Sequence, residues 1–150
     1  MKYLSLVPDS FFPPREIDLA GVRLSVLTID DVVQDYEAVI ESGGALHGLF
    51  SADDRWPDGL TLRDNIIDLG WHEKEFKRRS SFAWGLWQPD RSRYLGTAYV
   101  LPDPTREADA HAVHWIRKSE YDPKLRSVFK SEWEKWVREW PIGSFRFSPQ

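Results

Sequence analysis

The spacing of apolar residues changes along the chain, and each change predicts a boundary between elements. From Ile17 to Val26 the apolar positions suit a strand, with a turn or bulge at Ala20-Gly21. After Thr28 and again after Thr61 the apolar positions recur every three or four residues, which predicts two helices. Each threonine is followed three residues later by an aspartate, a spacing close to that of a capping box.

The apolar residues of these helices also predict which faces are buried. The first helix ends at Gly43-Gly44, and its predicted buried positions are Val32, Val33, Tyr36, Val39 and Ile40. The second helix extends to about Arg79, and its predicted buried positions are Leu62, Ile66, Leu69 and Phe76. In this interpretation His72 lies on the polar face of the second helix, which Trp71 anchors.

After Ser81 the alternation becomes twofold, which predicts strands at 82–87, 94–101 and 110–116. Short turns join them, so we expect an antiparallel meander. A last helix is predicted to begin at Asp122-Pro123 and to end before Gly143, and a final strand spans 144–148. A strand–helix–strand connection favours parallel strands. The order β-α-α-β-β-β-α-β therefore predicts an α/β fold, a mixed central sheet with helices packed on it.

Composition narrows the class of protein. A chain of 150 residues with 41% apolar residues is expected to form one domain, preceded by an extended lead-in over residues 1–15. The net charge of −4 excludes a globally basic nucleic-acid binder, and the absence of cysteine excludes disulfides, thiol catalysis and cysteine-ligated zinc. With no apolar run of 18 residues, we expect a cytoplasmic protein with neither a nucleic acid nor a membrane as partner.

Two strand sequences carry a resemblance to a known family. The segment 93–100, Arg-Tyr-Leu-Gly-Thr-Ala-Tyr-Val, resembles the third strand of the GNAT superfamily of N-acyltransferases. The segment 113–121, which ends in Glu120-Tyr121, resembles the fourth strand and its exit toward the coenzyme A loop. The resemblance covers roughly Ile17 to Phe147 and implies a GNAT-like fold and an acyl-coenzyme A-dependent N-acetyltransferase.

The coenzyme A loop departs from the family pattern. That pattern is Gln or Arg, two residues, Gly, one residue, then Gly or Ala. Here Asp122 stands in place of the first residue and Leu125 in place of the first Gly. A leucine side chain obstructs the close approach of a phosphate to the backbone, and an ionised aspartate opposes an anion at a helix N-terminus. Pro123 also removes an N–H donor.

The family usually continues past its fifth strand with a helix and two further strands, which often carry the Tyr that protonates the departing thiolate. No residue before Gln150 corresponds to that Tyr. The shortened pattern suggests either a partner that completes the fold or a homodimer formed at the unfilled end of the sheet.

The resemblance also implies the residues of a site. The backbone of Trp115, Ile116 and Arg117 would pair with the pantetheine arm of acetyl-coenzyme A. The N–H groups near Lys124, Arg126 and Ser127 would bind the pyrophosphate, and His114 or Glu120 would serve as the catalytic base.

Each candidate has a structural alternative. The alternative for His114 is an ordinary histidine on a half-exposed strand face. The alternative for Glu120 is a solvated carboxylate in a loop. His111 and His114 point to opposite faces of a strand, so no metal is expected. The cations from Lys74 to Arg79 suit either an anion site or a helix C-terminus. The tryptophans at 133, 136 and 140 suit either a stacking platform or the core, and helical spacing favours the core.

Two functions follow. The first is an N-acetyltransferase that uses acetyl-coenzyme A and a small-molecule or peptide amine as acceptor. The second is a non-catalytic binding or dimerisation module of the same fold that has lost coenzyme A binding.

Overall fold

Six strands form one sheet in chain order, β1-β2-β3-β4-β5-β6. The computed structural model describes residues 4–120 and 122–150, so Tyr121 of the predicted Glu-Tyr pair lies outside the described residues. All neighbouring strands are antiparallel except β5 and β6, which are parallel as predicted. The strands are β1 (Glu16–Leu19), β2 (Val22–Val26), β3 (Phe82–Trp87), β4 (Tyr94–Pro102), β5 (Ala110–Ile116) and β6 (Phe145–Ser148).

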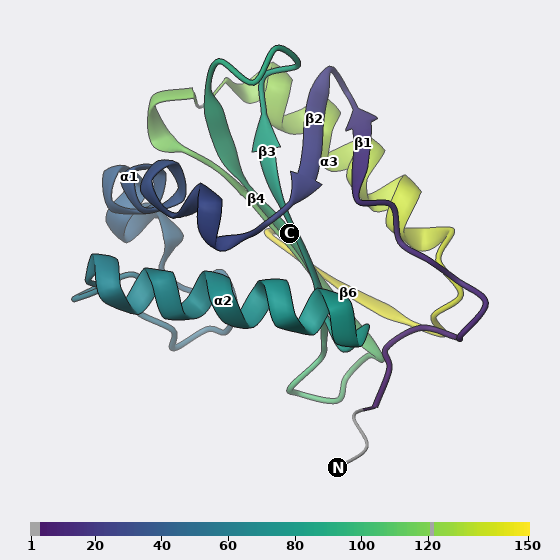
Figure 1. Ribbon diagram of the computed structural model, residues 1–150. Helices are drawn as coiled ribbons and strands as arrows, with labels where there is room; N and C mark the ends of the chain where they lie inside the picture. Colours follow the sequence, from purple (N-terminus) through teal and green to yellow (C-terminus); the bar gives the residue numbers. More distant parts are fainter. Residues whose placement is uncertain (1–3, 121) are drawn as a thin grey trace.

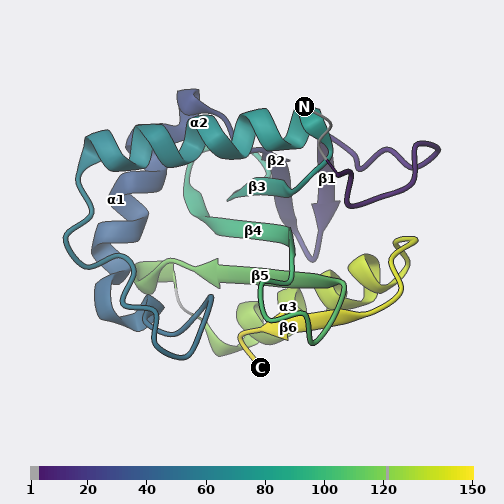
Figure 2. The same ribbon diagram turned by 90° about the horizontal axis from the view of Figure 1, so that it is seen from below.

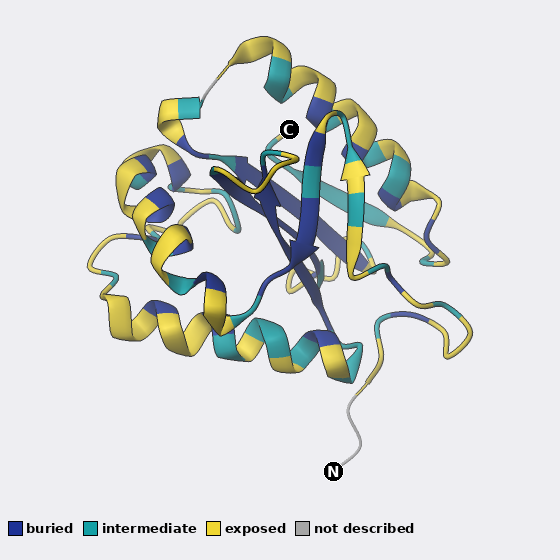
Figure 3. Cartoon of the chain, turned by 45° about the horizontal axis from the view of Figure 1, so that its top comes forward, coloured by how far each residue is buried: buried dark blue, intermediate teal, exposed yellow. Residues whose placement is uncertain are grey.

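The helices cover both faces of this sheet (Figure 1). They are α1 (Val32–Ser42), α2 (Leu62–Arg78) and α3 (Pro123–Arg138), with short 3-10 turns at Ile29–Asp31, Gly43–Leu46 and Lys118–Glu120. Helices α1 and α2 lie on one face and α3 on the other, as the view from below shows (Figure 2). The central strands are therefore buried on both sides (Figure 3), which is why β3 is apolar throughout.

The helix starts confirm the capping prediction. Thr28 and Thr61 each accept a backbone hydrogen bond inside the first turn, and Asp31 and Asp64 accept one from the backbone N–H of the respective threonine. Asp122 caps α3 by accepting the Lys124 N–H at 2.8 Å, with Pro123 at the first helical position. The first predicted strand is a hairpin, because Ala20 and Gly21 both adopt positive φ and reverse the chain.

The predicted faces of α1 and α2 are partly wrong. Val33 and Ile40 on α1 are exposed, and so are Leu62, Ile66 and Trp71 on α2. Polar residues take inward positions instead: Asp35 and Ser42 on α1, and Asn65 and His72 on α2. The apolar pattern misplaced both faces because hydrogen bonds inside the protein satisfy most of these polar groups.

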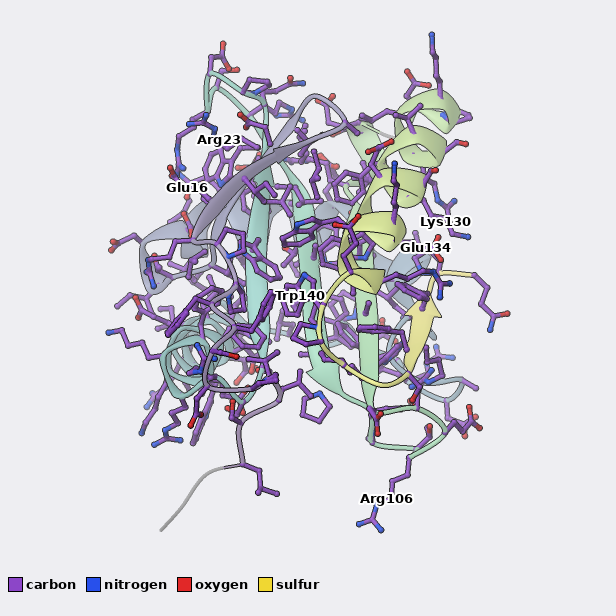
Figure 4. All side chains as sticks on the ribbon, turned by 90° about the vertical axis from the view of Figure 1, so that its right-hand side faces the viewer. Glu16, Arg23, Arg106, Lys130, Glu134 and Trp140 are labelled. Carbon is purple, nitrogen blue, oxygen red and sulfur yellow. The ribbon has the colours of Figure 1, made fainter. Side chains whose placement is uncertain are left out.

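Trp133 of α3 and Trp140 just after it belong to the core, as the helical spacing favours, and the partly buried Trp136 packs against it. Trp133 and Trp140 are buried, and both contact Trp84 of β3 edge to face. Trp140 lies between the sheet and the N-terminal segment, where its ring also contacts Phe11, whereas Lys130 and Glu134 project from the outer side of α3 (Figure 4). These rings therefore hold α3 and residues 6–11 against the sheet.

Strands β5 and β6 pair over only part of their length. The parallel register runs from Ala110 opposite Phe145 to Val113 opposite Ser148, whereas β5 continues to Ile116. A polar cluster secures the paired end, since Arg146 donates to Asp103 at 2.9 Å and His111 bonds Ser148 at 2.8 Å. Beyond Val113 the edge of β5 has no strand beside it in the described part of the chain.

Gly96 permits the close approach of β4 to this end of β5. A Cβ at Gly96 would lie 2.0 Å from the Trp115 carbonyl oxygen, far inside van der Waals contact. Any side chain at this position therefore pushes the end of β5 away from β4.

We predict that Gly96→Ala lowers the free energy of unfolding by about 3 kcal/mol, the upper end of the range for overpacking. Gly70→Ala is the matched control: its Cβ would lie 3.7 Å from Ile29, an ordinary contact. In the middle of α2 that change is expected to raise stability by up to about 1 kcal/mol. Urea unfolding of both variants checks this, and equal effects would contradict it.

Candidate functional site

A cavity of about 150 Å³ lies at the open edge of β5. Residues from the end of α1, the turn after it, β5 and the start of α3 surround it. Its lining residues are Ser42, Ala45, Leu46, Leu49, His114, Trp115, Ile116, Lys118, Arg126 and Pro149. We call it the edge cavity. It has apolar walls and two cationic side chains, Lys118 and Arg126.

Helix α1 holds the segment that leaves β5. Arg117 donates to both carboxylate oxygens of Glu41, from Nη2 at 2.9 Å and from Nε at 3.2 Å. The same carboxylate accepts the Ser119 N–H at 2.9 Å, and the Ser42 hydroxyl accepts the Lys118 N–H at 3.1 Å. These bonds fix one wall of the edge cavity. Hydrogen bonding from Arg117 lowers the pKa of Glu41 to about 2.

The backbone of Arg117 is used within the fold. Its N–H donates to the Leu95 carbonyl at 2.7 Å, and its carbonyl accepts the Glu120 N–H at 3.0 Å. Of the three residues predicted to pair with a pantetheine arm, Trp115 and Ile116 line the edge cavity, whereas Arg117 serves as an anchor.

The two predicted catalytic residues lie in different environments. His114 lines the edge cavity, packs on Phe129 and is buried, and its Nε2 has no hydrogen-bond partner among the described residues. Burial lowers its pKa to about 3, with Arg126 and Lys130 acting in the same direction, so the imidazole is neutral at pH 7. Glu120 forms an ion pair with Arg93 and does not line the cavity.

A second cavity, of about 290 Å³, lies between α1, α2 and the sheet. We call it the acidic cavity. Its lining residues are Leu27, Asp35, Phe50, Asp54, Trp56, Asn65, Asp68, Leu69, His72 and Tyr99. The apolar pattern did not predict this cavity, because it places His72 on the polar face of α2 and does not indicate that Asp35 and Asn65 are buried. The spacing of polar residues could have indicated it. Asp35 lies four positions before the buried Val39, and Asn65 four before the buried Leu69, so each polar residue shares a helix face with a buried apolar one.

A buried carboxylate organises this cavity. Asp35 accepts hydrogen bonds from Asn65 at 2.9 Å, Tyr94 at 2.7 Å and Thr97 at 3.0 Å. Burial raises the pKa of Asp35, and the three donors oppose that rise. Gly85 makes room for the Tyr94 ring, which would lie 2.9 Å from a Cβ at that position.

Aromatic rings separate the two cavities. Trp115, which lines the edge cavity, donates from Nε1 to the hydroxyl of Tyr99, which lines the acidic cavity, at 3.2 Å. Trp56 contacts the Trp115 ring edge to face, and Phe50 contacts both Trp56 and Tyr99. The two cavities therefore share one wall.

No family model and no curated protein matches the chain. Solved structures do match. The acetyltransferase RimL, in its apo form, has a TM-score of 0.67 at 14% identity over 91% of this chain and 76% of RimL. The microcin immunity acetyltransferase MccE, in complex with acetyl-CoA and AMP, has a TM-score of 0.67 at 9% identity over 91% and 74%. An acetyltransferase from Salmonella typhimurium that modifies the N-terminal serine of a ribosomal protein has a TM-score of 0.61 at 11% identity over 85% and 70%. The chain has the GNAT acetyltransferase fold.

The GNAT fold confirms the predicted architecture and allows the coenzyme site to be tested. Past Val113 the β5 backbone has no strand partner on its β6 side among the described residues, which is the kind of edge with which an extended pantetheine arm would pair. The start of α3 does not fit a backbone cradle for phosphate. There the Asp122 carboxylate takes the Lys124 N–H, the Asp122 carbonyl takes the Arg126 N–H, and Pro123 has none. The cationic side chains near this helix start are Lys118, Lys124 and Arg126.

The described residues limit other chemistry. Residues 4–120 and 122–150 contain no group of three His, Asp or Glu side chains arranged to hold a metal ion. Within the same residues, no helix has the length and apolarity needed to cross a membrane. Lys77 and Arg78 complement the C-terminus of α2, and Arg79 donates to the carbonyls of Pro8 and Phe11, which agrees with the structural interpretation of this basic cluster.

We predict that the Glu41–Arg117 pair makes the free energy of unfolding depend on pH in the acidic range. The folded-state pKa of Glu41 is lowered, so its contribution is complete above about pH 4.5 and is lost as the pH falls toward 2. After allowance for solvent screening, Glu41→Gln is expected to lose about 1–2 kcal/mol at pH 7, and its deficit shrinks as the pH falls.

Glu37→Gln is the matched control, because Glu37 lies 3.5 Å from the same Arg117 but its side chain is 68% exposed. Its effect is expected to stay below about 0.5 kcal/mol. Urea unfolding between pH 7 and pH 2.5 measures both variants. A deficit for Glu41→Gln that is constant over this range would contradict the prediction.

Proposed function

We propose that the protein transfers an acyl group from acetyl-coenzyme A, or a related acyl-coenzyme A, to an amine. The observation that carries the proposal is the edge cavity, where β5 continues past its last pairing with β6 and the space beside it is lined by residues of α1, the turn after α1, β5 and α3. The similarity in fold to acetyltransferases supports the proposal, and MccE is in complex with acetyl-CoA.

Each part of the edge cavity has an assigned task. Trp115 and Ile116 line the path of the pantetheine arm, and Arg117 holds that path in place through Glu41. Lys118 and Arg126, which line the edge cavity, are assigned to the phosphates, together with Lys124 and Ser127, which are exposed within the first five residues of α3. The coenzyme would supply the thioester: the neutral amine would form a C–N bond to the acyl carbon, the C–S bond would break, and the amine proton would end on the departing coenzyme A thiol.

The amine must lose a proton before or during its attack on the thioester. Of the two predicted bases we assign the role to His114, because it lines the edge cavity and its Nε2 has no hydrogen-bond partner among the described residues. Its low pKa makes it a weak base, which suits a hydrogen bond better than full proton abstraction. Glu120, held by Arg93, is assigned to positioning the turn before α3.

The second candidate function is a non-catalytic binding or dimerisation module. The start of α3 favours it, because a carboxylate and a leucine occupy the positions where a phosphate would meet backbone N–H groups. A homodimer and a cytoplasmic location stay predictions under either function.

Calorimetric titration with acetyl-coenzyme A separates the two functions. The catalytic function predicts measurable binding below millimolar concentration and acetylation of amines in a coupled thiol-release assay. A folded protein that shows no heat and no thermal stabilisation at millimolar coenzyme would establish the non-catalytic function.

Two substitutions test how the start of α3 limits binding. Asp122→Ser keeps the N-cap and removes the negative charge, so coenzyme affinity is expected to rise about two- to fivefold. Leu125→Gly removes the obstructing side chain and is expected to raise affinity further. Leu125→Ala is the control for lost packing, since it retains a Cβ. An unchanged dissociation constant in both Asp122→Ser and Leu125→Gly would show that phosphate does not bind at this helix.

A further inference from the structure

The acidic cavity carries carboxylates but no cationic partner for them. The Asp35 carboxylate accepts three hydrogen bonds, but all three donors are neutral and do not balance its charge. Asp54 and Asp68 also line the cavity, and none of its lining residues is Lys or Arg. Carboxylates in a cleft with low-dielectric walls focus a negative potential into it. The cavity therefore attracts a cation.

One wall of the cavity is aromatic. Phe50, Trp56 and Tyr99 contact one another in series, with ring centroids 5.4 Å and 5.3 Å apart. Aromatic faces attract organic cations and also bury apolar carbon. A hydrated metal ion gains nothing from such a wall, whereas an ammonium group attached to an apolar body gains from both the rings and the carboxylates.

His72 provides a second and independent indication of a ligand. Its ring packs against Tyr99, and its Nδ1 is inaccessible to solvent without a hydrogen-bond partner among the described residues. Buried polar atoms without partners are rare in folded proteins, and this one belongs to a ring that lines the cavity. Burial lowers the pKa of His72, so the ring is neutral and does not repel a cation.

The size and location of the cavity restrict the ligand. A volume of about 290 Å³ lies at the lower end of the usual range for small-molecule sites. Through the Tyr99–Trp115 wall, the cavity adjoins the edge cavity assigned to the thioester. Asp68 stands at an exposed position, and a neighbouring surface hollow that shares Trp56 and Asp68 adds Asp58 and Asp64. The approach to the cavity is therefore acidic as well.

We propose that the acidic cavity binds a small organic ammonium ion with an apolar or aromatic body, and that such a primary amine is the acyl acceptor. Asp68 and Asp35 supply the negative charge, Phe50, Trp56 and Tyr99 contain the apolar body, and His72 contacts a polar group of the ligand. The acceptor role rests on the proposed function. Binding of the amine does not.

The test compares two ligands of equal shape in the absence of coenzyme. Benzylamine carries an ammonium group at pH 7, whereas benzyl alcohol is its neutral counterpart. Calorimetry on the full chain is expected to show binding of benzylamine about tenfold or more tighter than that of the alcohol, the factor that a charge-assisted hydrogen bond carries. Equal affinity for the two ligands, or no binding of benzylamine, would overturn the proposal.

Substitutions test whether benzylamine binds in the acidic cavity. Asp68→Asn removes one charge at an exposed position, where the fold tolerates it, and is expected to weaken benzylamine binding about tenfold. Asp9→Asn is the matched control, because it removes the same charge from the exposed lead-in and leaves affinity unchanged. His72→Phe keeps a ring against Tyr99 and is also expected to weaken binding. Equal affinities for wild type and for both Asp68→Asn and His72→Phe would place the amine elsewhere and overturn the assignment.

An activity assay separates this inference from the proposed function. With acetyl-coenzyme A present, benzylamine is expected to be acetylated faster than a peptide with a free N-terminal serine. Acetylation of the peptide alone would overturn the inference and leave the proposed function standing. Tight benzylamine binding without acetylation of any amine would leave the ammonium site standing and overturn the proposed function.

Discussion

A single buried carboxylate organises one face of the sheet. Asp35 on α1 takes hydrogen bonds from Asn65 on α2 and from Tyr94 and Thr97 on β4, residues that lie 30, 59 and 62 positions away in the chain. Burying a carboxylate without such donors would be strongly unfavourable, so α1 and α2 must sit where these groups converge. The same arrangement places Asp35 in the wall of the acidic cavity, which makes the structural centre of this face part of a binding site.

The two cavities divide the reaction that we propose. The edge cavity lies where β5 extends beyond its pairing with β6. Glu41 holds Arg117 and Ser119 at the point where the strand ends. The acidic cavity lies across an aromatic wall in which Trp115 and Tyr99 are hydrogen-bonded. Trp115 of β5 lines the edge cavity, and Tyr99 of β4 lines the acidic cavity. Such a division lets each reactant be bound by a different chemistry, apolar and cationic on one side and acidic and aromatic on the other.

The start of α3 is where this chain differs most from the pattern of coenzyme A-binding loops. The cap that stabilises the helix is an aspartate, and the same carboxylate lowers the affinity of the helix N-terminus for anions. Helix stability and phosphate binding therefore compete for the same N–H groups. In the function that we propose, Lys118 and Arg126 would bind phosphate through their side chains, without those N–H groups.

The sequence alone determined the elements, their order and the mixed sheet, because capping residues, turn residues and apolar period act locally. Thr28, Thr61 and Asp122 cap helices where expected, and the tryptophans of α3 pack in the core. The pairing of Trp115, Ile116 and Arg117 with a pantetheine arm, which the resemblance implies, stays a prediction. Only the tertiary structure decided which faces of α1 and α2 are buried, and so brought Asp35, Asn65 and His72 into a cavity. A hydrophobic pattern cannot show this, since whether a polar side chain is buried depends on donors supplied by distant parts of the chain.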